Sequence, residues 1–178
     1  KIKSGKKPHW RFKLNKNEIL WKDLIKGDVS FNPKYLSDPV LIREDGTLLY
    51  HLPSVIDDVQ EKITHIVRGE DHIANTAFHI QIFKALDSAI PTFAHHPFLI
   101  DDEGKGFSKR MGSLSIESFK REGFENITLL NYFLFIGSSS NIEPIIDLKN
   151  IVNKFDITKI SKSSAKFSKQ SLISLNQD

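Results

Sequence analysis

The chain has 178 residues, of which 39% are hydrophobic, and its thirteen Phe suffice for a core, which excludes a globally disordered protein. Its 25 Lys and Arg outnumber 22 Asp and Glu, and the formal charge of +3 permits a nucleic-acid partner without requiring one. The absence of Cys excludes disulfides, thiolate zinc sites and a thiol nucleophile, and the absence of a run of roughly 20 apolar residues predicts a cytoplasmic protein with no membrane partner.

The first third of the chain contains one clear local pattern. Residues 1–39 are polar and interrupted by prolines, and we expect irregular structure there. Residues 40–42 and 47–52 are two apolar β-type runs on either side of an Asp-Gly turn. This arrangement predicts a β-hairpin.

The middle of the chain alternates strand and helix patterns. Residues 63–67 are short and rich in β-branched side chains, which is typical of a strand. A helix is predicted from an N-cap at Asn75 or Thr76 to about Leu86. A third β-type run follows within residues 93–100. The order strand, helix, strand predicts a βαβ unit with parallel pairing.

The last third has the periodicity of helices. Gly123 and Gly137 each follow an amphipathic run and are expected to end it. The predicted helices cover residues 115–122, 127–136, 147–155 and 168–175. The fold class is therefore predicted as α/β in the first part, followed by an all-helical part.

A glycine-flanked loop at residues 105–112 is the first candidate for chemistry. It contains Ser108, Lys109 and Arg110 and follows the acidic turn of residues 101–104. Such a loop brings backbone N–H groups close to a ligand and directs two cations at phosphate oxygens, as phosphoryl or nucleotidyl transfer requires. It lacks the Walker spacing, and from the residues alone a solvated basic turn is the more frequent interpretation.

The run Arg68-Gly69-Glu70-Asp71-His72 is the second candidate. It follows a predicted strand and precedes a helix, which is where open parallel sheets bind ligands. An arginine at this position can pair with a substrate carboxylate through two hydrogen bonds, and the acids can accept from an amino or ribose hydroxyl group. An ion-paired strand-to-helix turn explains the same pattern equally well.

The remaining polar residues form weaker patterns. Tyr50 can line a pocket through its hydroxyl group, while Asp57 and Asp58 can cap a helix or end a strand. The spacing of His72, His79, His95 and His96 matches no zinc motif, so structural or exposed histidines are expected. No Ser/His/Asp triad can be assigned.

Taken in order, these segments resemble the bacterial glutamyl-tRNA synthetases, a family of class I aminoacyl-tRNA synthetases. Residues 50–58 (Tyr-His-Leu-Pro-Ser-Val-Ile-Asp-Asp) look like the segment with the substrate-contacting tyrosine. Residues 63–72 (Ile-Thr-His-Ile-Val-Arg-Gly-Glu-Asp-His) resemble the strand and the substrate turn. Residues 104–112 correspond to the KMSKS-type loop, and residues 129–134 and 160–167 resemble the region that contacts the tRNA stem.

The resemblance implies a domain arrangement. Residues 1–45 would end an inserted acceptor-binding region, and residues 46–100 would form the second half of a Rossmann-type parallel-sheet catalytic domain. Residues 101–178 would hold the KMSKS-type loop and the helical stem-contact region. Because the chain starts with Lys, has no HIGH-like motif and shows no anticodon-binding domain after Asp178, we expect a central slice that is inactive by itself.

The implied activity is that of a glutamate–tRNA ligase. It would use ATP, accompanied by Mg²⁺, to convert L-glutamate into glutamyl-adenylate and would then transfer the glutamyl group to the 3′ end of tRNA. The partner would be tRNA(Glu), or both this tRNA and tRNA(Gln), and the parent enzyme would be a monomer. In this family the first step generally needs the tRNA already bound. A glutaminyl-tRNA synthetase-like ligase and a catalytically silent tRNA-binding remnant are the alternatives.

The resemblance also assigns roles to individual residues. Tyr50, Ser54 and Arg68 would bind the amino acid, and no protein-held metal ion is implied. The residues implied at ATP are Glu70, Asp71, His72 and Lys109. The residues implied in catalysis are Lys109, Ser108 and Arg110, through stabilisation of the leaving phosphates. One departure concerns this loop, because Gly106 and Phe107 stand where the family has its first lysine and a bulky aliphatic residue.

Overall fold

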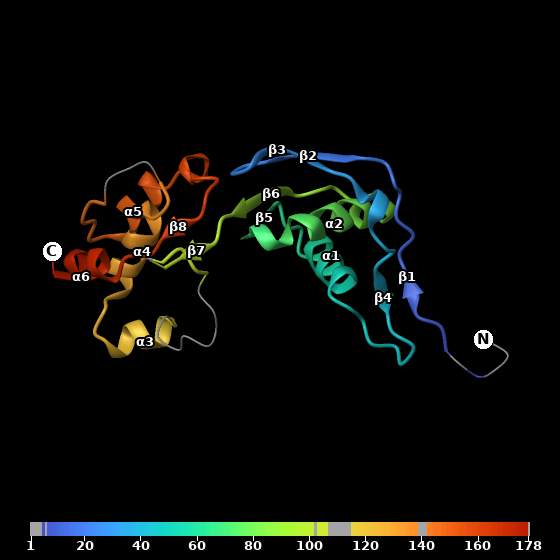
Figure 1. Cartoon of the computed structure of the whole chain (residues 1–178), viewed down its shortest axis with the longest axis horizontal. Coiled ribbons are helices and arrows are strands. Elements are labelled where there is room, and N and C mark those ends of the chain that lie inside the picture. Colours follow the sequence, from blue (N-terminus) through green and yellow to red (C-terminus); the bar gives the residue numbers. More distant parts are fainter. Residues whose placement is uncertain (1–4, 6, 102, 107–114, 139–141, 178) are drawn as a thin grey trace. The chain divides into compact units, whose positions relative to one another are not determined.

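The computed structural model describes residues 5, 7–101, 103–106, 115–138 and 142–177, except for the side chain of Tyr35. The chain forms two compact units, Lys1–His95 and His96–Asp178. Figure 1 shows the strands β2, β3, β5 and β6 with helices α1 and α2 in the first unit, and helices α3 to α6 in the second. No helix among these residues is both long and apolar enough to cross a membrane.

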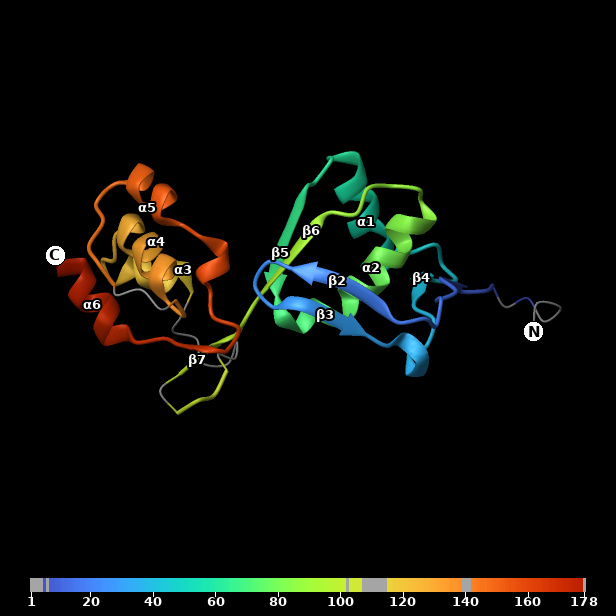
Figure 2. The same ribbon diagram turned by 90° about the horizontal axis from the view of Figure 1, so that it is seen from above.

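A four-stranded sheet in the order β3-β2-β6-β5 lies at the centre of the first unit (Figure 2). Its strands are β2 (Ile19–Asp23), β3 (Gly27–Phe31), β5 (His65–Gly69) and β6 (Thr92–His96). Strands β2 and β3 are antiparallel, and β2 pairs with β6 in parallel through Asp23 and Phe93. Residues before position 46 thus share a sheet with residues after it, and the predicted subdivision at 45 and 100 stays a prediction.

The β2–β3 hairpin corrects the expectation of irregular structure in residues 1–39. Gly27 closes its three-residue turn with φ +80°, a backbone conformation that side chains disfavour. Along β2, Ile19 is buried, Leu20 is exposed and Trp21 is half-buried. This alternation of burial is typical of a strand with one covered face, and the prolines lie outside both strands.

Helices α1 (His51–Gln60) and α2 (Ile73–Ala85) pack against each other and lie on one face of the sheet (Figure 1). Their apolar side chains meet those of the strands in one core. The buried members of this core are Ile19, Val55, Ala77, Ile80, Ile82, Phe83 and Phe93. The shared core holds the start of α1 and the first turns of α2 against the sheet.

The predicted hairpin at residues 40–52 is confirmed only in its first part. Strand β4 (Val40–Ile42) pairs with β1 (Trp10–Arg11), and Leu48 forms an isolated antiparallel bridge with Ile42. From His51 onward the chain is helical, so the predicted second arm is too long. Pro53 is compatible with α1 because N–H groups in a first helical turn lack intrahelical partners.

The predicted strand–helix–strand order at residues 63–100 is confirmed by β5, α2 and β6. The predicted helix start at Asn75 or Thr76 is wrong, since a 3₁₀ turn (Glu70–His72) leads directly into α2 and His72 occupies the N-cap position. The Thr76 hydroxyl group instead lies 3.2 Å from the carbonyl oxygen of His72, one turn earlier. The Asn75 and Thr76 side chains hydrogen-bond to other side chains and do not cap the helix.

The second unit contains the four predicted helices and two short strands. The helices are α3 (Ile116–Arg121), α4 (Asn126–Phe135), α5 (Leu148–Lys154) and α6 (Lys169–Gln177). The sequence did not predict β8 (Ala165–Lys166), which pairs in parallel with β7 (Leu99–Ile100). A 3₁₀ turn (Ile157–Lys159) precedes β8. The buried core of this unit consists of Phe119, Phe124, Leu129, Tyr132, Phe167, Leu172 and Leu175.

Two glycines end helices in the second unit, as predicted. Gly123 follows α3 with φ +86°, and Gly137 follows α4 with φ +71°. A Cβ atom at Gly123 would meet no atom within 4 Å, whereas one at Gly137 would lie 2.9 Å from the Cβ of Ala165. The two positions therefore share the backbone requirement, and only Gly137 is also sterically restricted.

Replacing each glycine by alanine separates these two effects. Gly123→Ala is expected to lower the free energy of unfolding by about 1 kcal/mol, the left-handed backbone penalty alone. Gly137→Ala is expected to lower it by about 2–3 kcal/mol, because the new methyl group also displaces β8. Urea unfolding of both variants, followed by far-ultraviolet circular dichroism, measures the difference. Equal losses would contradict the close approach of Gly137 and Ala165.

Candidate functional site

Arg68, near the end of β5, is the centre of a hydrogen-bonded cluster in the first unit. Its Nη2 atom donates to the Thr76 hydroxyl oxygen at 2.5 Å, and Nη1 donates to the Tyr50 hydroxyl oxygen at 3.2 Å. Longer contacts of 3.5 Å join Nη1 to Nδ1 of His79 and Nε to Nε2 of His95. Four acceptors, two from α2 and one each from the N-cap of α1 and from β6, thus orient one guanidinium group.

The charge of Arg68 is not neutralised by direct contact. Among the described residues no carboxylate forms an ion pair with it, and its four hydrogen-bond partners are all uncharged groups. Burial lowers the pKa of Arg68, while Tyr50, Asp58 and Asp71 act in the opposite direction. The Arg68 guanidinium also lies 5.7 Å from the centre of the Phe93 ring. A fixed, partly desolvated cation of this kind is a favourable partner for an anion.

The protonation of two histidines follows from the position of Arg68. His79 is fully buried, and burial, followed by the charge of Arg68, lowers its pKa to about 3. Because a guanidinium can only donate, Nδ1 of His79 accepts, and the proton of this ring lies on Nε2. That atom is 3.1 Å from Nδ1 of His51, whose pKa is also lowered, chiefly by burial. A chain of neutral imidazoles therefore extends from Arg68 to α1.

Tyr50 and His72 form the accessible side of the cluster. Tyr50 is 45% exposed and precedes α1, and its hydroxyl group lies 3.3 Å from Nδ1 of His72. The side-chain nitrogen Nδ2 of Asn75 donates to the same ring nitrogen of His72 at 3.0 Å. A ligand that approaches Arg68 from solvent would therefore meet the Tyr50 hydroxyl group beside it.

The 3₁₀ turn after β5 presents two carboxylates at the edge of this cluster. Glu70 forms an ion pair of 2.5 Å with Lys26, which lies in the turn between β2 and β3. Asp71 is exposed, and its carboxylate lies 3.8 Å from Nε2 of His72. The hairpin turn is thereby connected to the end of β5, where the second sequence-predicted candidate lies.

The structure brings together most of the sequence-predicted substrate residues. Tyr50 contacts both Arg68 and His72, and Glu70 and Asp71 lie in the turn that begins after Gly69. Ser54 is half-buried on α1, one turn after Tyr50, and its backbone N–H donates to the carbonyl oxygen of Tyr50 at 3.2 Å. Three further candidates lie outside the described residues, namely Ser108, Lys109 and Arg110. The roles of all these residues stay predictions.

Sequence reasoning missed several members of the cluster. Thr76 was expected only as a cap, and His79 and His95 only as non-metal histidines. Asp23, whose carboxylate lies 2.6 Å from Nδ1 of His95, was not singled out. Within the described ranges, no three His, Asp or Glu side chains are arranged to hold a metal ion. The one available signal was the spacing of Thr76 and His79, since residues three apart share a helix face.

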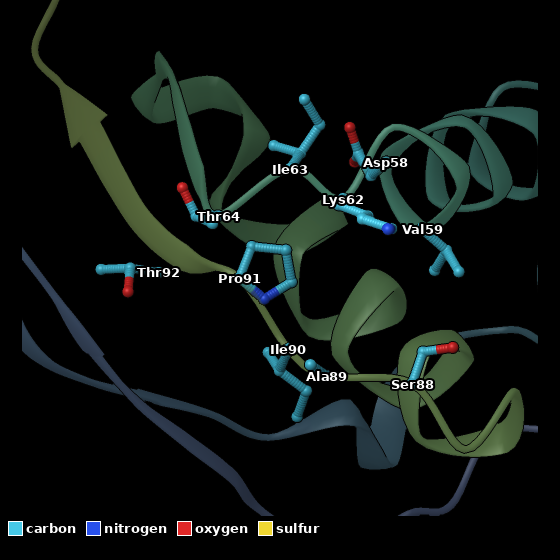
Figure 3. Close-up of a pocket in the computed structure, with 10 residues that line it drawn as sticks. All are labelled: Asp58, Val59, Lys62, Ile63, Thr64, Ser88, Ala89, Ile90, Pro91 and Thr92. Atoms are coloured by element: carbon cyan, nitrogen blue, oxygen red, sulfur yellow. The ribbon is translucent and has the colours of Figure 1, made fainter.

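A separate cleft of about 460 Å³ lies where β5 and β6 begin, whereas Arg68 lies near the end of β5 (Figure 3). Figure 3 shows side chains from the end of α1 and from the segment that leads into β6. Burial raises the pKa of Asp58, which belongs to this cleft, but none of the predicted substrate residues lies there. The lining residues are Asp58, Val59, Lys62, Ile63, Thr64, Ser88, Ala89, Ile90, Pro91 and Thr92. The Arg68 cluster is therefore the stronger candidate site.

The sequence matches the family described as tRNA synthetases class I (E and Q), catalytic domain, over residues 1–174. Among curated relatives, the glutamate–tRNA ligase of Azospirillum brasilense is 51% identical over 173 residues, which cover 97% of this chain and 39% of that protein. Glutamate–tRNA ligase 2 of Beijerinckia indica is 46% identical over 174 residues, covering 97% and 39%. The chain therefore spans about two fifths of the length of these relatives.

The chain is also similar in structure to solved glutamate-tRNA synthetases. A crystal structure of a glutamate tRNA ligase from Elizabethkingia meningosepticum, in complex with its amino acid, superposes with a TM-score of 0.86. The sequences are 30% identical, and the match covers 99% of this chain and 39% of that one. The glutamate-tRNA synthetase of Elizabethkingia anophelis gives a TM-score of 0.85 at 29% identity, covering 99% and 40%.

The buried neutral His79 predicts a loss of stability in mild acid. Its pKa is about 3 in the folded chain and near 6.5 when unfolded, so the unfolded state binds more protons as the pH falls through 6.5. Between pH 7.5 and pH 5.5 the free energy of unfolding should fall by about 1.4 kcal/mol from this residue alone. Urea unfolding at the two pH values measures the change.

Two variants test the assignment to His79. His79→Gln should reduce the difference between the two pH values, even if the variant is less stable at both. His65→Gln makes the same change at an exposed position and should keep the wild-type difference. An unchanged pH dependence in His79→Gln would contradict the burial of a neutral imidazole at this position.

Proposed function

The chain belongs to the class I tRNA synthetases of the glutamyl and glutaminyl type, and from this premise we propose that it forms the amino-acid-binding part of a glutamate–tRNA ligase. The observation that supports the proposal is Arg68, a fixed cation at a strand end whose direct partners are all neutral. The family includes enzymes for both amino acids, while the named relatives are glutamate–tRNA ligases. Glutamate is therefore favoured over glutamine.

L-Glutamate suits this site because it brings carboxylates to an unpaired guanidinium. A carboxylate that approaches Arg68 gains charge-assisted hydrogen bonds and neutralises a positive charge that no carboxylate of the described residues pairs with. The Tyr50 hydroxyl group lies beside Arg68 and is accessible, so it can rotate to donate to the same ligand. Ser54, one turn further along α1, would add a second hydroxyl group.

ATP would bind next to the amino acid, at the turn after β5. Glu70 and Asp71 can accept from ribose hydroxyl or amino groups, and His72 lies between them and Tyr50. Mg²⁺ would enter with ATP, held mainly by its phosphates, because this ion is usually bound through one or two carboxylates and substrate oxygens. The exposed carboxylate of Asp71 fits that requirement.

The proposed reaction has two steps, adenylate formation and transfer of the glutamyl group to tRNA. An oxygen of the α-carboxylate of glutamate attacks the α-phosphorus of ATP, the bond from that phosphorus to the bridging oxygen breaks, and pyrophosphate leaves. Lys109, with Ser108 and Arg110, would stabilise the charge on the leaving phosphates. A hydroxyl group of the terminal ribose of tRNA next attacks the carbonyl carbon of the adenylate, and AMP leaves.

The second unit would contact the tRNA. Phosphate contacts supply most of the affinity of such complexes, and lysines are exposed across this unit. They include Lys149, Lys154, Lys159, Lys162, Lys166 and Lys169. The parent enzyme would act as a cytoplasmic monomer, with tRNA(Glu), or both it and tRNA(Gln), as its substrate.

The role of Arg68 is tested by Arg68→Lys in the intact synthetase that contains this chain. Lysine keeps the charge but cannot reach Thr76, Tyr50 and His95 at once, so the KM for glutamate should rise by about tenfold to a hundredfold. Glutamate-dependent ATP–pyrophosphate exchange with tRNA present measures it. Arg43→Lys at an exposed turn is the matched control. An unchanged KM in Arg68→Lys would refute the assignment.

The role of Lys109 is tested by Lys109→Ala in the same enzyme. The loss of one cation from the leaving phosphates should slow adenylate formation by about a hundredfold, while the Kd for tRNA should change far less. Lys105→Ala is the control, since Lys105 is an exposed residue of the same loop that pairs with Glu103. Comparable losses in both measurements would count against the assigned role.

A further inference from the structure

A buried acid–imidazole pair lies directly behind Arg68. Asp23 ends β2, His95 lies on β6, and both side chains are completely shielded from solvent. Oδ2 of Asp23 is 2.6 Å from Nδ1 of His95. Oδ1 accepts three backbone N–H groups, from Ile25 at 3.0 Å, Lys26 at 2.9 Å and His95 at 3.1 Å. Both oxygens of this buried carboxylate therefore accept hydrogen bonds.

The position of each proton in the pair follows from these contacts. Burial raises the pKa of Asp23, but the hydrogen bonds from Lys26, His95 and Ile25 together outweigh it, so the pKa is lowered and the carboxylate is ionised. Burial lowers the pKa of His95 and, together with the charge of Arg68, outweighs the opposing effect of Asp23. A neutral His95 that donates from Nδ1 to Asp23 has a bare Nε2 atom.

That bare nitrogen faces the groups that orient Arg68. Nε2 of His95 is 2.8 Å from the Thr76 hydroxyl oxygen and 3.5 Å from Nε of Arg68. The Thr76 oxygen itself accepts from Nη2 of Arg68 at 2.5 Å, and the nearer of the two acceptors for its own proton is Nε2 of His95, since the carbonyl oxygen of His72 lies 3.2 Å away. If the His95 proton were on Nε2 instead, this N–H group would face two other donors, the Nε–H of Arg68 and the hydroxyl group of Thr76, and could not accept from either.

We propose that Asp23 and His95 are positioning residues for Arg68. Asp23 holds the His95 proton on Nδ1, which keeps Nε2 available as the acceptor that fixes Thr76 and the guanidinium plane. The β2–β3 hairpin thereby sets the geometry of a site built on β5, α1 and α2. This inference rests on the proposed binding of the amino acid by Arg68.

A purely structural pair would behave differently. Asp23 and the residues around His95 also join β2 to β6, so any change at either position affects stability. A structural role alone predicts that only the free energy of unfolding responds. The positioning role also predicts that the His95 proton moves between ring nitrogens and that glutamate binding weakens with it.

The decisive variant is Asp23→Asn. Three backbone N–H groups point at the Oδ1 position, so the amide oxygen takes that place and the NH₂ group faces Nδ1 of His95. The His95 proton must then move to Nε2, towards Arg68. Imidazole ¹⁵N NMR of the intact synthetase should show the Nδ1–H form in the wild type and the Nε2–H form in the variant, and the KM for glutamate should rise about tenfold or more.

Asp28→Asn is the matched control, since it makes the same substitution at an exposed position of β3. It should change neither the His95 resonance nor the KM. Retention of the Nδ1–H form in Asp23→Asn would overturn the proposal, and so would a moved proton with an unchanged KM while Arg68→Lys shows its expected rise. An unchanged KM in Arg68→Lys counts instead against the proposed function of Arg68.

Thr76→Val tests the same link if Asp23→Asn does not fold. Valine keeps the shape of threonine but removes the oxygen between Arg68 and His95. The KM for glutamate should rise about tenfold, the His95 proton should stay on Nδ1, and Thr76→Ser should restore the wild-type KM. A wild-type KM in Thr76→Val, or no rescue by Thr76→Ser, would overturn the proposal.

Discussion

The partly buried guanidinium of Arg68 is the constraint on which the rest of the first unit depends. A partly desolvated cation is unfavourable unless polar groups surround it, and here these groups are two neutral imidazoles, a hydroxyl group and a phenol. Hydrogen bonds offset the loss of water but leave the charge itself uncompensated. The site is thus organised around a positive charge that an anionic ligand can complete.

The packing of two helices on one sheet explains how these acceptors come together. Thr76 and His79 are three residues apart on α2, so both face Arg68, while the start of α1 brings Tyr50 and His51 to the same point. Val55 and Phe83 anchor the two helices in the shared core. The same core that stabilises the unit therefore sets the distances in the site.

Local patterns predicted the elements whose signals are local. Helical periodicity and the two glycines, Gly123 and Gly137, predicted the helices of the second unit, and in the structure Asp147 caps α5 by accepting from the N–H of Asn150. The β2–β3 hairpin and β8 were missed because partners distant in the chain stabilise them: β2 lies beside β6, and β8 beside β7. A two-residue strand has no periodicity to detect.

The sequence by itself determined the family and located Arg68-Gly69-Glu70-Asp71-His72 after a strand, because consecutive residues carry that information. Only the tertiary structure decided that Asp23 meets His95, 72 residues away, and that His79 is neutral and accepts from Arg68. The physical reason is that a hydrogen bond needs atoms about 3 Å apart. Propensity and periodicity describe how each segment folds, whereas the packing of one segment on another sets that distance and, through burial, the charge of each group.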